Sequence, residues 1–227
     1  SQRDAVDQAR QTYLAVVAQC GLKPEAVASR TERTIPGPHG PIPVRVYTPQ
    51  GSGPFPVLVY FHGGGWVIGH PDAVDGPCTV LANRAHAVVV SVDYRLAPEH
   101  PFPAPLDDCL AATTWVTEQT TLLNGDPERI AVGGDSAGGN LAAVVSLLCR
   151  DQGGPKLVMQ LLIYPATDVA SDTASYRENG EGYFLTTALM QWFYDHYLPD
   201  QSSRSDWRAS PLRAPDLGNL PPALIIT

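Results

Sequence analysis

The 227-residue sequence is poor in basic residues and in cysteine, and it has no long hydrophobic run. Fifteen Lys and Arg against 23 Asp and Glu give a net charge of −8, which disfavours nucleic acid and anionic membranes as partners. No apolar run reaches the roughly 18 residues of a membrane span, and the polar start lacks the apolar core of a signal peptide. The four Cys are widely spaced without a CxxC pair, which favours reduced thiols in a cytoplasmic protein over disulfides or a metal site.

What remains is the composition of a globular domain. Hydrophobic residues make up 44% and charged residues 17%, and the length is sufficient for one domain with a substantial core. The chain has no initiator Met, and its apolar last residues, PPALIIT, lack a following turn. We therefore expect a fragment of a longer protein.

Short apolar segments alternate with segments of helical periodicity. Strands are expected at 31–35, 42–47, 57–61, 86–94, 130–132, 157–164 and 223–227. Helices are expected at 4–19, 72–86, 105–119, after Ser136 and at 187–198. Loops are expected at the proline-rich PGPHGP (36–41), at NGDPER (124–129), and over 165–185 and 199–222. This alternation predicts an α/β fold with a mostly parallel central sheet flanked by helices.

Two segments interrupt the alternation. Residues 1–30 contain the N-terminal helix, and residues from about 168 to 208 form an insertion. We expect both to contribute to a helical lid, with residues 31–227 as the main domain.

The main chemical motif is Gly134-Asp135-Ser136-Ala137-Gly138, placed between an apolar strand and a helix. G-x-S-x-G alone is weak evidence, because Gly and Ser are common and an ordinary strand–helix turn can contain a serine. In this context, however, small neighbours permit a sharp turn that lifts the Ser136 hydroxyl clear of the sheet. The N–H groups at the start of the following helix then suit a developing negative charge.

A second motif, His62-Gly63-Gly64-Gly65-Trp66, directly follows the buried strand 57–61. In α/β-hydrolases a glycine loop after an early strand supplies backbone N–H donors for the oxyanion hole. Glycine is needed there because the backbone itself must approach the substrate carbonyl. The two motifs together predict acyl transfer with Ser136 as nucleophile.

The segments HGGGW, YRLAPEH (94–100) and GDSAGGNLA, in this order, resemble those of the bacterial hormone-sensitive-lipase-like, or family IV, esterases. The similarity runs from about Val57 to the end and includes LLIYP and LPPALIIT. It implies an α/β-hydrolase fold with a lid, and a carboxylesterase that acts on small-molecule esters of short to medium acyl chains. It also implies that no cofactor or metal is needed.

The resemblance also assigns roles in the oxyanion hole. Ala137 would supply the first N–H donor, and Gly64 and Gly65 the others, with Gly63 as an alternative. His62 is expected to hold the glycine loop by hydrogen bonding rather than to act as a base. Trp66 either floors the substrate pocket or belongs to the core.

Other polar residues of the motifs are expected to be structural. Asp135 should form hydrogen bonds rather than catalyse, and Arg95 and Glu99 should brace loops by ion pairing. The remaining histidines are expected in loops or on the surface: His39, His70, His86, His100 and His196.

A serine nucleophile needs a base and an orienting acid. By resemblance, the acid follows the strand that matches PPALIIT, and the histidine comes roughly 30 residues later. Both would lie beyond Thr227, with Asp168 as an alternative acid, so residues 1–227 alone are expected to be nearly inactive. A non-catalytic small-molecule-binding protein of the same fold, an amidase and a lactonase remain alternatives, and a homodimer is expected through the C-terminal strand region.

Overall fold

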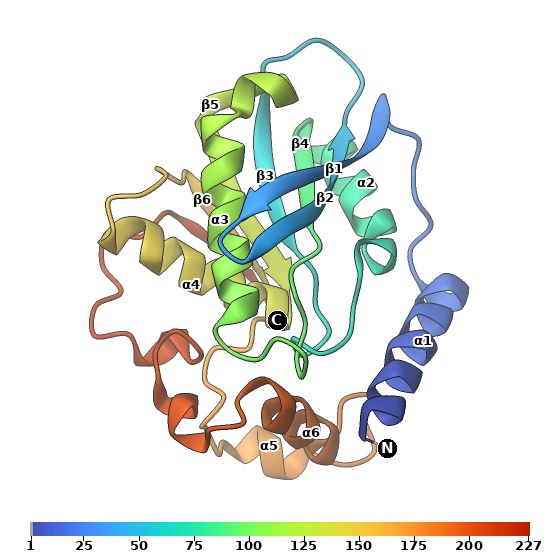
Figure 1. Ribbon diagram of the computed structural model, residues 1–227, viewed down its shortest axis with the longest axis vertical. Helices are drawn as coiled ribbons and strands as arrows, with labels where there is room; N and C mark the ends of the chain where they lie inside the picture. Colours follow the sequence, from blue (N-terminus) through green and yellow to red (C-terminus); the bar gives the residue numbers. More distant parts are fainter. Residues whose placement is uncertain (1) are drawn as a thin grey trace.

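A seven-stranded sheet forms the centre of the computed structural model, which describes residues 2–227 (Figure 1). Its strand order is β1-β2-β4-β3-β5-β6-β7. The strands are β1 Ser29–Gly37, β2 Gly40–Thr48, β3 Phe55–Phe61, β4 Val88–Val92, β5 Gly125–Asp135, β6 Met159–Ile163 and β7 Ala223–Ile226. The pairs from β4 to β7 are parallel and those involving β1 and β2 are antiparallel, which confirms the mostly parallel sheet.

Helices cover both faces of this sheet. The α-helices are α1 Gln2–Cys20, α2 Asp75–Ala85, α3 Ala104–Glu118, α4 Ala137–Asp151, α5 Ala174–Glu178 and α6 Thr187–Tyr197. Short 3-10 helices are η1 Pro71–Ala73, η2 Thr120–Leu123, η3 Gln201–Ser205 and η4 Pro211–Arg213. None of the helices within residues 2–227 is long and apolar enough to cross a membrane.

Two hydrophobic cores follow from the alternation of side chains along β3. Val57, Val59 and Phe61 join the larger core, which α3 and α4 cover. Leu58 and Tyr60 point to the opposite face and join the smaller core under α2. The continuous apolar run at 57–61 is therefore explained by a strand that is buried on both faces.

The loop expected at residues 36–41 is wrong, because this segment forms the tip of a tight hairpin between β1 and β2. Pro36 pairs with Pro41 and Gly37 with Gly40, which leaves only Pro38 and His39 in the turn. Pro36 lies on β1, the outermost strand, and Pro41 lies outside the part of β2 that pairs with β4, so neither proline interrupts an interior ladder of hydrogen bonds.

Two further loops contain regular structure. Residues 125–129, expected as a loop, belong to β5, where Gly125 pairs with Phe55 of β3 before a register shift. The irregular segment 165–185 includes the short helix α5.

The start of helix α2 also differs from the expected one. Helix α2 begins at Asp75 rather than at residue 72, because η1 occupies the three residues from Pro71 to Ala73.

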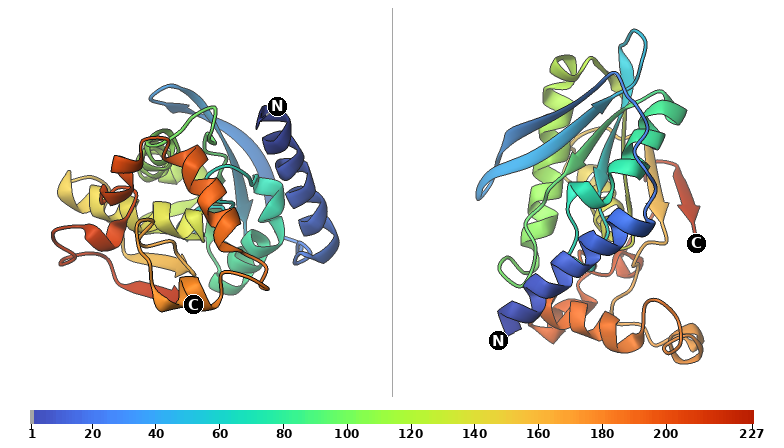
Figure 2. Two further views of the ribbon diagram at one scale, coloured as in Figure 1. Left: turned by 90° about the horizontal axis from the view of Figure 1, so that it is seen from below. Right: turned by 90° about the vertical axis from the view of Figure 1, so that its right-hand side faces the viewer.

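Helices α5 and α6 lie beyond the carboxyl ends of the parallel strands (Figure 1). Seen from below, α6 crosses in front of the sheet, and α1 runs along one side (Figure 2). The segments expected to form a lid therefore gather at the end of the sheet that holds Ser136. The division of the chain into a main domain and a lid stays a prediction.

Within residues 2–227, strand β7 forms one edge of the sheet. It pairs with β6 on one side only, and all four of its residues are exposed. Leu224, Ile225 and Ile226 have exposed fractions of 48%, 58% and 46%. An apolar strand edge is thus accessible on this side of the molecule.

Candidate active site

Ser136 occupies a strained turn between β5 and α4. Its φ of 54° and ψ of −116° lie in a region that residues with a side chain rarely adopt. Its N–H donates to the carbonyl of Ile163 at 2.8 Å, and its own carbonyl accepts from Asn140 N at 3.0 Å. These bonds fix the backbone of Ser136 between β6 and α4, while its side chain stays partly accessible.

Two glycines let α4 approach β3 closely. A Cβ on Gly138 would lie 1.9 Å from the carbonyl oxygen of Phe61, and one on Gly134 would lie 2.4 Å from the same atom. Neither position can hold a side chain without moving backbone. This close approach brings the residues after Phe61 next to Ser136.

Those residues form the glycine loop. Gly64 and Gly65 have φ values of 124° and 57°. The carbonyl of Gly64 accepts the N–H groups of Val67 at 3.1 Å and Ile68 at 2.9 Å, which closes a tight turn.

The N–H groups of this loop differ in their availability. Gly63 N donates to Oδ1 of Asp135 at 3.1 Å. No hydrogen bond found among residues 2–227 uses the N–H of Gly64 or Gly65. The first N–H groups of a helix, such as that of Ala137, also lack intrahelical acceptors. This pattern favours Gly64 and Gly65 over Gly63 as oxyanion donors.

Asp135 ties the serine turn to the glycine loop. Its Oδ1 accepts from the Tyr60 hydroxyl at 2.8 Å as well as from Gly63 N. Burial raises the pKa of this carboxyl. Its hydrogen bonds match the structural role expected from the sequence.

His62 is fully buried below the glycine loop. Its Nδ1 lies 2.8 Å from the carbonyl of Gly63 and therefore donates a proton to it. The ring stacks on Tyr94 at 4.3 Å between centroids, and the Tyr94 hydroxyl donates to the His62 carbonyl at 2.6 Å. Burial lowers the pKa of His62 to about 4, so the ring is neutral near pH 7. These contacts support a loop-holding role and leave the ring poorly placed to serve as a base.

Two cavities meet at Ser136. The first, of about 330 Å³, is mainly apolar and includes the residues of the expected oxyanion hole. Its other lining residues include Tyr13, Trp66, Ile68, Phe184, Leu189, Met190 and Phe193. Trp66 is also a core residue, 1% exposed and stacked on Tyr197 at 4.4 Å, which confirms the expected place in the core.

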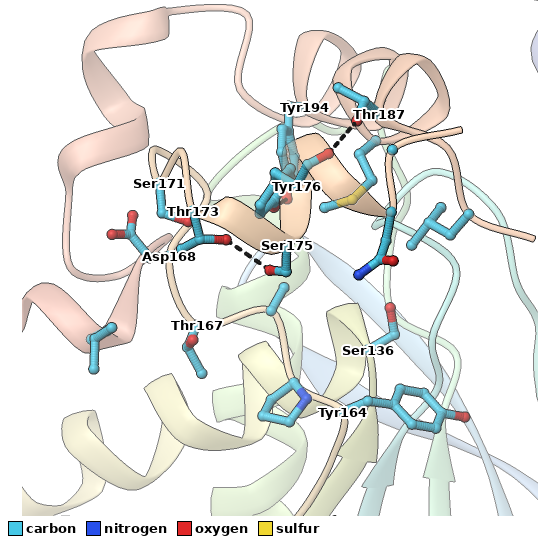
Figure 3. Close-up of a pocket in the computed structure, with 17 residues that line it drawn as sticks. Ser136, Tyr164, Thr167, Asp168, Ser171, Thr173, Ser175, Tyr176, Thr187 and Tyr194 are labelled. Atoms are coloured by element: carbon cyan, nitrogen blue, oxygen red, sulfur yellow. Dashed lines mark hydrogen bonds between the residues drawn. The ribbon is translucent and has the colours of Figure 1, made fainter. Parts of the chain in front are cut away.

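The second cavity, of about 500 Å³, is rich in hydroxyl groups (Figure 3). Its polar lining residues are Thr167, Asp168, Ser171, Thr173, Ser175, Tyr176, Asn179, Thr187 and Tyr194. Tyr164 and Ala166 line both cavities beside Ser136. An ester centred on Ser136 could therefore place one substituent in each cavity.

Tyr13 is one of the residues lining this site that sequence reasoning missed. It comes from α1, more than 120 positions before Ser136 in the sequence. Its helical spacing from Val6 and Arg10 was the available signal, since the three residues share one face of the helix.

Asp168 lies across the polar cavity from Ser136 (Figure 3). Its Oδ1 accepts from Arg213 Nε at 2.9 Å and from Ala170 N at 3.0 Å. Partial burial acts to raise the pKa of Asp168, but the hydrogen bonds from Arg213, Ala170 and Ser210 and the charge of Arg213 together outweigh it, so the pKa is lowered. The carboxylate is thus engaged away from the serine.

The expectation that His196 lies in a loop or on the surface is wrong. His196 is 6% exposed on α6, where its ring packs on Trp192 at 4.3 Å. Its Nδ1 lies 2.7 Å from the Trp192 carbonyl, one helical turn earlier. The other four histidines lie in turns or loops as expected.

No base accompanies the serine in the part of the chain that the structure describes. None of the hydrogen bonds found there involves the Ser136 hydroxyl. The same residues contain no group of three or more His, Cys, Asp or Glu side chains able to hold a metal ion.

The bracing ion pairs expected of Arg95 and Glu99 are confirmed. Arg95 Nε donates to Asp108 of α3 at 2.8 Å. Glu99 accepts from Arg10 of α1 through both of its carboxylate oxygens.

Comparison with known proteins gives concordant matches. The model of a family described as alpha/beta hydrolase fold matches residues 58–227. The carboxylic ester hydrolase LipN of Mycobacterium tuberculosis is 44% identical over 223 residues, covering 96% of this chain and 59% of that protein. The carboxylesterase NlhH of the same organism is 48% identical over 82% of this chain and 60% of that protein.

Comparison with solved structures also finds an esterase. The hyperthermophilic esterase of the archaeon Pyrobaculum calidifontis superposes with a TM-score of 0.92 at 43% identity, covering 100% of this chain and 72% of that chain. The chain spans about three-fifths of the length of the curated relatives LipN and NlhH.

Proposed function

This chain belongs to the α/β-hydrolase fold family, and we propose that it carries the nucleophile and oxyanion hole of a carboxylic ester hydrolase. The observation that carries the proposal is the placement of Ser136. Its strained turn faces a mainly apolar cavity together with the unused N–H groups of Gly64 and Gly65. The names of the relatives LipN and NlhH support ester hydrolysis as the reaction. The size of the apolar cavity suits short to medium acyl chains.

In the proposed reaction, Oγ of Ser136 attacks the ester carbonyl as its proton passes to a base. The carbonyl electrons move to oxygen, and the oxyanion accepts from the N–H groups of Gly64, Gly65 and Ala137. Each such donor typically stabilises the transition state by about 3 kcal/mol. The tetrahedral intermediate collapses with loss of the alcohol, and water then hydrolyses the acyl-enzyme.

We further propose that the base and its orienting acid are not among residues 2–227. His62 is braced under the glycine loop, His196 is buried on α6, and Asp168 is held by Arg213. Loss of the base of a serine triad costs about 10⁶ in kcat. This chain alone should therefore turn over esters very slowly.

The test of the nucleophile is labelling with a fluorophosphonate, followed by identification of the modified peptide. We expect slow modification of Ser136 in the unsubstituted chain and no labelling of Ser136→Ala. Ser171→Ala, which removes a control serine in the polar cavity, should label at the same rate as the unsubstituted chain. Equal labelling of Ser136→Ala and the unsubstituted chain would show that another residue is the nucleophile.

The test of the missing base is hydrolysis of p-nitrophenyl butyrate by the 227-residue chain. Turnover near the usual enzymatic value of about 10 s⁻¹ that disappears in Ser136→Ala would contradict it. Matched ester, anilide and lactone substrates would separate an esterase from an amidase or lactonase. A binding protein without catalysis would retain small molecules in the cavity but would not form an acyl-enzyme.

Two further proposals concern surroundings and assembly. Cys78, Cys109 and Cys149 are buried free thiols, which supports a reducing, cytoplasmic location. The exposed edge of β7 supports a homodimer through this strand region.

A further inference from the structure

One arginine of the N-terminal helix joins three separate segments of the chain. Arg10 donates to both carboxylate oxygens of Glu99, from Nη1 at 2.9 Å and from Nη2 at 2.7 Å. Its Nε donates to the Val67 carbonyl at 2.9 Å, and Nη2 donates to the Ala97 carbonyl at 3.0 Å. The planar fork of a guanidinium suits this set of acceptors, whereas an ammonium could not reproduce it.

Most other side chains of α1 are only partly buried. Among residues 3–20, Val6 is the one buried side chain, and the others are half-buried or exposed. Val6, Arg10 and Tyr13 follow each other at spacings of four and three residues, so they share the face that meets the body of the protein. From this face, Arg10 donates four hydrogen bonds to the body of the protein.

The partners of Arg10 lie close to the proposed oxyanion hole. Val67, whose carbonyl accepts from Arg10, donates its N–H to the carbonyl of Gly64. The hydrogen bond from Arg10 lowers the pKa of Glu99 to about 2, so the Glu99 carboxylate is ionised at neutral pH. The guanidinium of Arg10 thus contacts both Glu99 and Val67, the residue that closes the turn at Gly64.

One helical turn beyond Arg10, Tyr13 forms part of the wall of the apolar cavity beside Ser136. Burial raises the pKa of Tyr13 to about 12, with smaller contributions from the charges of Asp135 and Tyr164. This phenol therefore remains neutral near the site. Its ring can be present in the wall only when α1 is docked.

We propose that Arg10 is a positioning residue: it docks α1 on Glu99 and Val67 so that Tyr13 closes the apolar cavity and sets the acyl-chain preference. This inference rests on the proposed function, because it assigns the apolar cavity to the acyl chain. Arg10 and Glu99 form the docking pair, and Tyr13 is the specificity-determining residue.

Docking is tested by hydrogen–deuterium exchange, which does not depend on activity. In Arg10→Ala, amides of residues 3–20 should exchange about tenfold faster, since local opening becomes easier, while β3 and β5 keep their protection. Arg10→Lys should restore part of the protection. Gln11→Ala, an exposed neighbour on the same helix, should match the unsubstituted chain. Unchanged exchange of α1 in Arg10→Ala would overturn the proposal.

The effect on the pocket is tested with two fluorophosphonates that carry an ethyl or an octyl chain. A missing base slows the reaction of both probes equally. The octyl-to-ethyl ratio of labelling rates therefore measures how well the apolar cavity accommodates the longer chain. We expect this ratio to fall about fivefold in Tyr13→Ala and Arg10→Ala, with partial recovery in Arg10→Lys and no change in Gln11→Ala. A ratio unaffected in Tyr13→Ala would overturn the specificity role.

The two proposals fail in different ways. If neither probe labels Ser136 in the unsubstituted chain, the proposed function is wrong, and hydrogen exchange still decides whether Arg10 docks α1. If Ser136 labels normally but the ratio stays constant in every variant, the proposed function survives and the assignment of Tyr13 fails.

Discussion

Replacement of Gly138 by alanine should destabilise the protein, although the same change usually stabilises a helix. Gly138 lies in the first turn of α4, where alanine would ordinarily gain about 1 kcal/mol over glycine. Here the added Cβ would lie 1.9 Å from the oxygen and 2.5 Å from the carbon of the Phe61 carbonyl. It would also lie 2.7 Å from the His62 carbonyl oxygen. Backbone atoms of β3 cannot rotate away, so α4 must move.

The expected magnitude follows from these opposing terms. Overpacking of a close-packed interior costs about 1–3 kcal/mol, and the upper end applies where the obstacle is backbone. After subtraction of the helix-propensity gain, the free energy of unfolding should fall by about 2 kcal/mol. Gly139→Ala is the matched control, because its nearest new contact is the Pro165 Cβ at 3.0 Å. Relief there needs only a few tenths of an ångström, so its stability should change by less than about 1 kcal/mol.

Urea unfolding followed by circular dichroism measures both variants. With a slope of about 2–3 kcal/mol/M, the Gly138→Ala midpoint should fall by about 1 M. The labelling rate of Ser136 should fall as well, since the first turn of α4 shifts relative to the glycine loop. A Gly138→Ala protein that unfolds at the same or a higher urea concentration than the unsubstituted chain would refute the close-approach argument.

Two further substitutions probe charges near the site. Because burial lowers the pKa of His62 to about 4 from 6.5, the unfolded chain binds more protons between these values. The contribution of neutral His62 to the free energy of unfolding should therefore be fully present above pH 6.5 and should decline by up to about 3 kcal/mol as the pH falls to 4. Urea titrations at several pH values measure this decline, which should be smaller in His62→Gln. Asp168→Asn should lower stability by less than about 1 kcal/mol, because its pair with Arg213 is partly exposed, and should leave fluorophosphonate labelling unchanged. A loss of labelling as deep as that in Ser136→Ala would instead make Asp168 part of the catalytic machinery.

The core of the candidate site could be predicted from the sequence because its chemistry is local. The turn at Ser136 depends on small residues two positions away on each side, and the glycine loop depends on consecutive residues. The exclusion of Gly63 as a donor, by contrast, depends on Asp135 accepting its N–H. That contact spans 72 residues and has no signal in either motif alone.

Long-range contacts explain the other omissions. Arg10 meets Glu99 across 89 positions, and nothing in the spacing of either residue identifies its partner. The hairpin through Pro36 and Pro41 was misread because proline content does not tell an outermost strand from a loop. His196 was misread because its burial depends on where α6 lies, and the helical pattern alone does not show this.

The strand order has a consequence for synthesis on the ribosome. From β3 onward, β5, β6 and β7 join the same side of the sheet in the order in which they are translated. The nascent chain therefore exposes the unpaired edge of one parallel strand at a time, and the next strand in this series pairs with that edge. Within residues 2–227, β7 is the strand added last to this series, and its Leu224, Ile225 and Ile226 are exposed. During synthesis, we therefore expect chaperone binding and aggregation to concentrate at whichever parallel strand has just been made and is not yet paired on its outer side, rather than at the lid helices.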